Sequence, residues 1–265
     1  MIDKIDKTLY SIINKRRTIT AFVNQNVSEQ IKEDVNIFIK KKIILLFPHS
    51  KIELFMVPGI DGTVNILGFS DNSIEGNLNL GMALQQLDLF LNKKELGSYR
   101  FAFEKNKTAE IVELSPSLHY LATLTFGHKR FPLQINTQDL KKAVYIPIRK
   151  PIHEVSNNIN LAENKDLKSV LENMRLTPSM ANHQPWFFEL TMRNSKVYNR
   201  INIYIEKKSL LHKWLYETLH KIDIGGLILH GLLSLQKFGY NTSFVLDFKS
   251  LKGKYDKVGY ISFSK

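Results

Sequence analysis

The sequence predicts an α+β fold made of two similar halves within one chain. Helical and strand segments are interspersed without strict alternation, which argues against a doubly wound parallel sheet. Short segments of the first half recur in weakened form in the second, in the same order. With 265 residues, 43% of them hydrophobic, the chain can bury a full core. We therefore expect one compact unit, with one half at residues 1–135 and the other at residues 145–265.

Three pairs of segments carry the internal repeat. The pairs are residues 16–19 with 149–152, residues 46–50 with 176–180, and residues 78–81 with 222–225. Their order is the same in both halves and their spacing is roughly similar. Residues 131–148 are then expected to form the crossover between the halves.

Helices are predicted where apolar residues recur at intervals of three or four. They cover residues 3–15, a segment after Ser28 that includes residues 31–39, residues 78–95, a segment after Asn164 that includes residues 167–174, and residues 222–237. Ser28 and Asn164 are suited to cap the helices that follow them. The segments at 78–95 and 222–237 are strongly apolar, with Gly97 and Gly239 at their ends, and are expected to be buried central helices.

The predicted strands are short and rich in β-branched and aromatic residues. They are residues 52–57, 110–114, 121–126, 186–192, 201–205, 242–247 and 258–263.

Composition excludes several kinds of chemistry. The chain has no cysteine, so it contains no disulfide, thiolate nucleophile or iron–sulfur cluster, and redox chemistry would need a bound cofactor. It also lacks the G-x-S-x-G, G-x-x-x-x-G-K-[ST] and G-x-G-x-x-G motifs of hydrolases, phosphate loops and dinucleotide folds. The eight histidines include no H-E-x-x-H motif, and no metal is expected.

The net charge of +12 leaves a nucleic-acid partner open. The lysines are scattered in twos and threes and form no basic stripe interleaved with aromatic residues, so we do not expect this partner. The amino terminus mixes charges of both signs, unlike a signal peptide, and no segment reaches the roughly 18 apolar residues needed to span a bilayer. We therefore expect a soluble, cytoplasmic protein.

Two motifs could carry binding chemistry. Arg16, Arg17 and Thr18 follow the first predicted helix, where two guanidinium groups and a hydroxyl could hold a phosphate. An ordinary solvated helix end would look the same. Residues 178–186 read Pro-Ser-Met-Ala-Asn-His-Gln-Pro-Trp, with two prolines that fix turns and short polar side chains that could reach a ligand. A polar turn without function remains the alternative for this segment.

Together the two motifs resemble those of the nitroreductase family of FMN enzymes. In that family the pocket forms at a homodimer interface, and each chain contributes one of the motifs. Both motifs lie on one chain here, so the sequence resembles a fused, pseudo-dimeric branch of the family. The resemblance implies a nitroreductase-like fold, with Arg16, Arg17 and Thr18 on the FMN phosphate. It places Pro178, Ser179, Met180 and Asn182 on the flavin ring and ribityl chain, and Trp186 in the core.

Other segments resemble the family less tightly. Gly97 and Ser98 correspond to a glycine-rich turn that faces the flavin N5, although Gly97 could equally serve only to end a helix. Arg130 corresponds to a second arginine on the phosphate. Thr20 stands at the flavin edge where many relatives have Arg or Lys, so the lost cation could lower the reduction potential.

The repeat counterparts of the two motifs are degenerate. Arg149-Lys150-Pro151 has lost the hydroxyl, and residues 47–51 have lost the Asn and the Gln-Pro-Trp. We therefore expect one intact site and one vestigial site, with Arg16 more important for FMN than Arg149.

The resemblance implies an FMN-dependent NAD(P)H oxidoreductase. Hydride would pass through the flavin N5 to a small-molecule acceptor such as a nitroaromatic or a quinone, with no catalytic side chain. The protein would be a monomeric pseudo-dimer. A flavin-storage protein without turnover remains an alternative, as does, less favourably, a basic nucleic-acid-binding protein.

Overall fold

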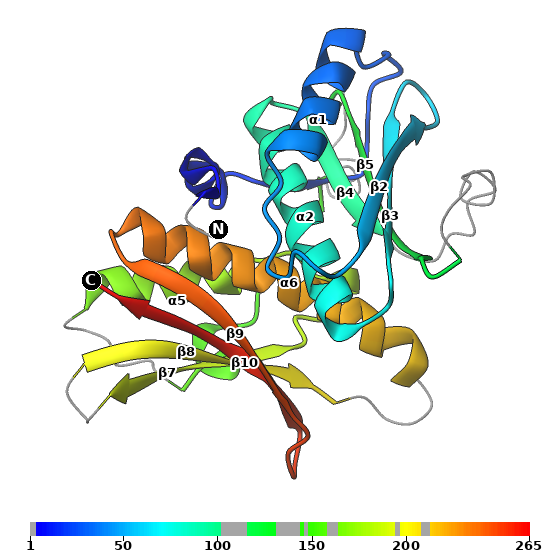
Figure 1. Cartoon of the computed structure of the whole chain (residues 1–265). Helices are drawn as coiled ribbons and strands as arrows, with labels where there is room; N and C mark the ends of the chain where they lie inside the picture. The colour runs from blue at the N-terminus through cyan, green and yellow to red at the C-terminus, as the bar shows by residue number, and fades with distance from the viewer. Residues whose placement is uncertain are drawn as a thin grey trace.

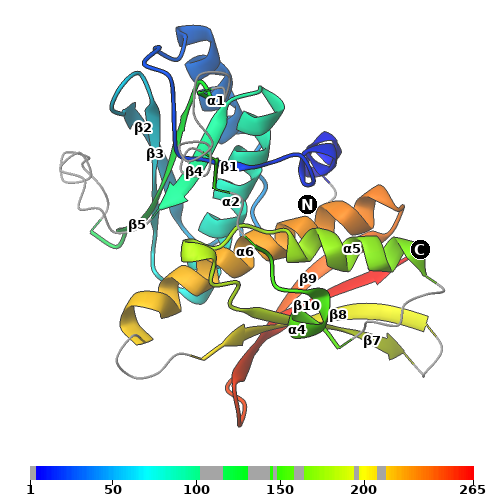
Figure 2. The same cartoon turned by 180° about the vertical axis from the view of Figure 1, so that it is seen from behind.

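The computed structural model describes residues 4–101, 116–130, 144–145, 148–157, 164–193, 197–207 and 213–265. Its described residues form two four-stranded antiparallel sheets with two long helices crossing between them (Figure 1). Figure 2 shows the same arrangement from behind, with α5 beside α6 over the second sheet. The α+β class predicted from the sequence is confirmed.

The described part of the first half contains a short 3-10 helix, two α-helices and one of the two four-stranded sheets. Its elements are η2 Lys7–Ile12, β1 Thr18–Ile19, α1 Glu29–Lys41, β2 Ile52–Pro58, β3 Val64–Ser70, α2 Ile74–Lys93, β4 Gly97–Phe101 and β5 His119–Gly127. The two-residue strand β6 Val144–Tyr145 lies in the predicted crossover and pairs with β1. The rest of residues 131–147, and the predicted strand at 110–114, lie outside the described residues.

The second half repeats this plan. Its elements are α4 Ile152–Val155, α5 Lys165–Arg175, η5 Met180–Asn182, β7 Trp186–Arg193, β8 Val197–Glu206, α6 Lys213–Lys237, β9 Asn241–Lys249 and β10 Tyr255–Ser264. The strand order is β7-β8-β10-β9, which matches β2-β3-β5-β4 strand for strand. The two halves are therefore similar, as the sequence repeat predicts, while the boundaries 1–135 and 145–265 remain a proposal.

A constant shift of 144 residues relates the central parts of the two halves. It takes Lys93, the end of α2, to Lys237, the end of α6, and Gly97, the start of β4, to Asn241, the start of β9. The strand pairing is also equivalent, because Arg100 of β4 lies opposite Leu124 of β5, and its counterpart Phe244 of β9 lies opposite Ile261 of β10.

The helices α2 and α6 cross at two glycines related by this shift. A Cβ atom on Gly81 would overlap the carbonyl oxygen of Ile222, and one on Gly225 would overlap that of Leu78. Leu78 and Ile222 are also related by the shift, so the contact is reciprocal, as at a two-fold interface. We call this interface between the halves the seam. Most described residues of both helices are buried, and most of the buried side chains are apolar.

Several predicted boundaries differ from the structure. The helix predicted at 3–15 is only the 3-10 helix η2, capped by the Asp6 carboxylate. The apolar helices predicted at 78–95 and 222–237 begin earlier, at Ile74 and Lys213. The caps at Ser28 and Asn164 are confirmed, because their side chains accept the N–H groups of Ile31 and Leu167. Within the described part of the chain, no helix has both the length and the apolar character needed to cross a membrane.

The left-handed residue after α2 is a glutamate, Glu95, with φ of 63°. Its counterpart after α6, 144 residues later, is Gly239, with φ of 81°. Gly97, which the sequence suggested as the helix stop, instead begins β4. A side chain in the left-handed region is disfavoured, so Glu95→Gly is expected to raise the free energy of unfolding by about 0.5–1 kcal/mol. Urea denaturation would measure it; lower stability in the variant would contradict the expectation.

Candidate functional site

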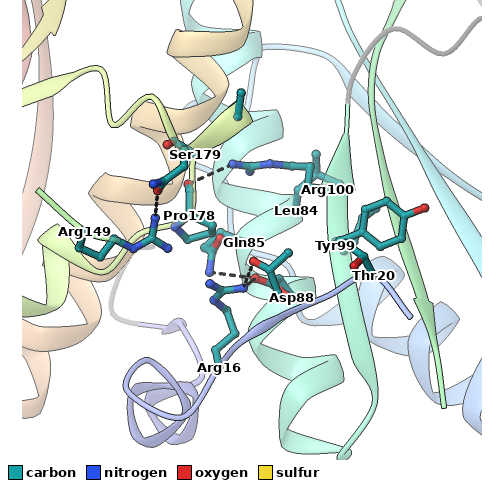
Figure 3. Close-up of a pocket in the computed structure, with 14 residues that line it drawn as sticks. Arg16, Thr20, Leu84, Gln85, Asp88, Tyr99, Arg100, Arg149, Pro178 and Ser179 are labelled. Atoms are coloured by element: carbon teal, nitrogen blue, oxygen red, sulfur yellow. Dashed lines mark hydrogen bonds and ion pairs between the residues drawn. The ribbon is translucent and has the colours of Figure 1, made fainter. Parts of the chain in front are cut away.

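A cavity lies at the seam and takes its walls from both halves (Figure 3). Its enclosed volume is about 180 Å³, and it opens to solvent. The polar lining is dominated by three arginines that come from different parts of the chain. Arg16 precedes β1, Arg100 is on β4, and Arg149 precedes α4. Two aspartates, Asp88 on α2 and Asp223 on α6, pair with two of these arginines.

Arg16 and Asp88 form a buried pair on one wall. Arg16 Nη1 lies 3.4 Å from Asp88 Oδ2, and both side chains are less than a tenth exposed. The same nitrogen donates to Thr18 Oγ1 at 3.3 Å. Burial lowers the pKa of Arg16, and the negative charge of Asp88 opposes that shift. Asp88 also accepts hydrogen bonds from Ser98 Oγ at 2.5 Å and from Asn92 Nδ2 at 3.2 Å.

Arg100 and Asp223 form a second pair, which joins the two halves. Arg100 Nη2 lies 2.8 Å from Asp223 Oδ1 and also donates to the carbonyl oxygen of Pro178 at 3.3 Å. The Met180 N–H donates to the two Asp223 oxygens at 3.0 and 3.2 Å. The pair thus holds residues 178–180 at both ends. Burial raises the pKa of Asp223 to about 7, although the Arg100 charge opposes the shift.

Arg149 lies against the turn that follows residue 179. Its Nη1 donates to Asn182 Oδ1 at 2.6 Å, and Asn182 Nδ2 donates to the carbonyl oxygen of Ile148 at 2.9 Å. Ala181, Asn182 and Gln184 have positive φ of 46°, 56° and 49°, which is uncommon for residues other than glycine. Such backbone costs of order 1 kcal/mol per residue and persists where surrounding contacts enforce it, often at functional sites.

A polar chain crosses the seam behind the cavity. Gln85 Nε2 lies 3.2 Å from His230 Nε2, and His230 Nδ1 lies 2.8 Å from the carbonyl oxygen of Asn173. Burial lowers the pKa of His230 to about 3, so the ring is neutral near pH 7. A neutral ring that donates from Nδ1 to the carbonyl accepts at Nε2 from the Gln85 amide.

Six of the residues predicted from the sequence line this cavity. They are Arg16, Thr18, Thr20, Pro178, Ser179 and Asn182. The structure thus brings the two motifs together from opposite sides of the seam. Whether these residues contact FMN stays a prediction.

Five predicted site residues do not line the cavity. They are Arg17, Gly97, Ser98, Arg130 and Met180. The Arg17 guanidinium donates to the carbonyl oxygens of Asn14 and Arg16. Ser98 is buried behind the wall, where it supports Asp88.

Gly97, Arg130 and the Met180 side chain also lie outside the cavity. Gly97 faces Ile19 and Lys129 at the start of β4. Arg130 is exposed, and its backbone N–H donates to the carbonyl oxygen of Ala21. The Met180 side chain packs against the hydrophobic core, and only its backbone N–H reaches Asp223.

Eight lining residues were not predicted from the sequence. They are Leu84, Gln85, Asp88, Tyr99, Arg100, Leu124, Arg149 and Ala181. One signal was available, because Gln85 and Asp88 are among the polar residues of a buried, leucine-rich helix. Arg149 was expected to belong to a separate vestigial site. That expectation is wrong, since Arg149 lies in the same cavity as Arg16.

The equivalent place in the other half is apolar. The shift of 144 residues replaces Gln85 by Leu229, Asp88 by Leu232 and Arg100 by Phe244. The Phe244 ring packs edge-on against Phe47 with 6.2 Å between centroids. Hydrophobic packing therefore takes the place of the polar cavity there.

Two solved structures described as nitroreductases are similar to this chain. The solved structure of a "putative nitroreductase" from Thermotoga maritima is similar over 94% of this chain and 93% of its own, with 16% identity and a TM-score of 0.61. The nitroreductase CinD from Lactococcus lactis, solved in complex with chloramphenicol, matches 48% of this chain and 92% of its own, with 16% identity and a TM-score of 0.38. No curated protein matches the chain.

The family model described as "Putative TM nitroreductase" matches residues 8–234, which include both motifs, the whole of α2 and most of α6. The chain therefore belongs to this nitroreductase family of oxidoreductases.

Proposed function

We propose that the protein is an FMN-dependent NAD(P)H oxidoreductase that holds its flavin in the seam cavity. The observation that carries the proposal is the convergence of three guanidinium groups with the hydroxyls of Thr18, Thr20 and Ser179 in one cavity. Two aspartates offset only part of that charge, so the cavity favours an anion.

The residues present fit FMN by their chemistry. Arginines and hydroxyls are the donors that phosphate needs, and the Tyr99 ring with Leu84 and Leu124 supplies the apolar surface that a flat ring system needs. The enclosed volume of about 180 Å³ is below the roughly 300 Å³ of a typical small-molecule site, so bound FMN would also occupy the open mouth.

FMN bound here would accept hydride from NAD(P)H and pass electrons to an acceptor such as a nitroaromatic or quinone. The chain's own residues bind and orient. Arg16 and Arg149 would hold the phosphate, while Ser179 and Asn182 would contact the ring and ribityl chain. No side chain acts as an acid or base in this proposal.

Arg100 bears on the choice between an enzyme and a storage protein. The absence of a cation at Thr20 is the feature that favours storage, because a nearby positive charge stabilises the reduced, anionic flavin. In the structure Arg100 lines the same cavity as Thr20, and Asp223 offsets only part of its charge, because burial raises the pKa of Asp223 to about 7. The cavity is therefore not short of positive charge, which favours turnover.

The absorbance of the purified protein tests the proposal. We expect a yellow protein that binds a single FMN per chain, because the equivalent place in the other half is filled by Phe244 and Leu232. Anaerobic addition of NADH or NADPH is expected to bleach the flavin. Two FMN per chain would contradict the single cavity. Failure to bleach with either nucleotide would favour the storage protein over the enzyme. A colourless protein that refuses added FMN would rule out both.

A further inference from the structure

Asp223 is the only described carboxylate that touches both an arginine of the cavity wall and the turn that forms the opposite wall. Its partners are Arg100 of β4 at 2.8 Å and the Met180 N–H of η5 at 3.0 Å. The Asp223 side chain is 1% exposed. When the charge of Asp223 changes, these neighbours must therefore compensate for the change, because water does not reach the carboxyl group.

We propose that Asp223 couples the binding of an anion in the seam cavity to the uptake of one proton. When Asp223 is ionised, it and Asp88 offset two of the three arginines. When Asp223 is protonated, Arg100 loses its counter-charge and the cavity holds one more uncompensated positive charge, which suits a doubly charged anion such as a phosphate or sulfate.

The groups that act on Asp223 are Arg100 on β4, Arg149 ahead of α4 and the Met180 amide of η5. On α6 itself, the titratable residue about one turn earlier is His220. Both charged neighbours, Arg100 and Arg149, stabilise the carboxylate, and burial opposes them. A bound anion would weaken the effect of these arginines and would itself repel the carboxylate, so its pKa would rise further.

The sign of the coupling follows. Burial leaves Asp223 with a pKa of about 7, and a bound anion raises that pKa, so the complex holds more protons than the free protein near neutrality. Anion affinity therefore increases as the pH falls. For a shift of about one pKa unit, affinity is expected to be about fivefold higher at pH 6 than at pH 8.

Sulfate is the suitable probe, because it keeps two charges over this range and its own titration does not interfere. Calorimetry of sulfate binding to the flavin-free full-length chain at pH 7, in buffers of different protonation enthalpy, measures the protons taken up. For that shift, wild type is expected to take up about 0.4 of a proton at pH 7, and Asp223→Asn none. The matched control is Asp34→Asn, which should behave as wild type. The Asp34 carboxylate is on α1 and lies 2.7 Å from Lys94 Nζ, at the end of α2.

The inference rests on the proposed function only in that both need an anion in this cavity. Sulfate binding to wild type without proton uptake would overturn it, even if Asp223→Asn does not fold. Equal uptake by wild type and Asp223→Asn would also overturn it. If FMN still binds and bleaches in either case, the proposed function stands. If neither sulfate nor FMN binds, both proposals fail.

Discussion

Gly225→Ala is expected to lower the free energy of unfolding by about 3 kcal/mol, a large loss for a single methyl group. The added Cβ would overlap the carbonyl oxygen of Leu78, which is backbone of the central helix α2 and cannot rotate away. The two helices would have to separate at the seam, and each of them is buried along most of its length. Chemical denaturation of the flavin-free protein would measure the loss.

The adjacent glycine provides the control. A Cβ on Gly226 would lie 3.3 Å from its nearest neighbour, the Thr177 Cγ2 methyl, which is a side-chain atom. Alanine is also about 1 kcal/mol better than glycine inside a helix. Gly226→Ala should therefore be near neutral. Similar losses in the two variants would show that the close approach at Gly225 does not limit how the halves pack.

Arg16→Ala is expected to destabilise the fold by about 3 kcal/mol, independently of any flavin. Its removal leaves Asp88 buried without its cation, and burying an uncompensated charge is costly. Hydrogen bonds from Ser98 and Asn92 remain and keep the loss from being larger. Denaturant unfolding of the flavin-free variant would measure it.

Arg149→Ala is the matched comparison, because Arg149 lines the same cavity and donates to the neutral amide of Asn182. Its loss should cost only about 1 kcal/mol. The double variant Arg16→Met, Asp88→Leu should recover most of the stability, since leucine already occupies the equivalent position 232. No recovery in the double variant would mean that the pair is not what makes Arg16 important for stability. FMN binding is expected to fall in both single variants.

Local chemistry explains which parts of the fold the sequence predicts. Helix α1 is predictable because its apolar residues repeat every four positions and Ser28 caps it through a 3.3 Å bond to the Ile31 N–H. Strand β3 carries no such signal. Asn65 and Gly68 interrupt its apolar residues, and it becomes a strand through pairing with β2 and β5.

The site residues also divide into those that the sequence predicts and those that it does not. Ser179 and Asn182 belong to a compact motif and are predictable from it. Arg100 and Asp88 lie far apart in the sequence from Arg149 and meet it only because α2, β4 and residues 148–150 converge at the seam. The role of the Asp223 carboxylate is harder still to predict from the sequence, because it depends on contacts with Arg100 and Met180 that no local pattern encodes.

The replacement of Asp88 by Leu232 in the other half has a consequence for how such a protein evolves. In a symmetric assembly of two identical chains, one codon specifies both copies of a residue, so neither cavity can change alone. Joining the halves separates these codons, and a substitution that would harm a binding cavity can be kept where it improves packing. One half is then free to specialise in structural support, while the other retains the charged residues that bind.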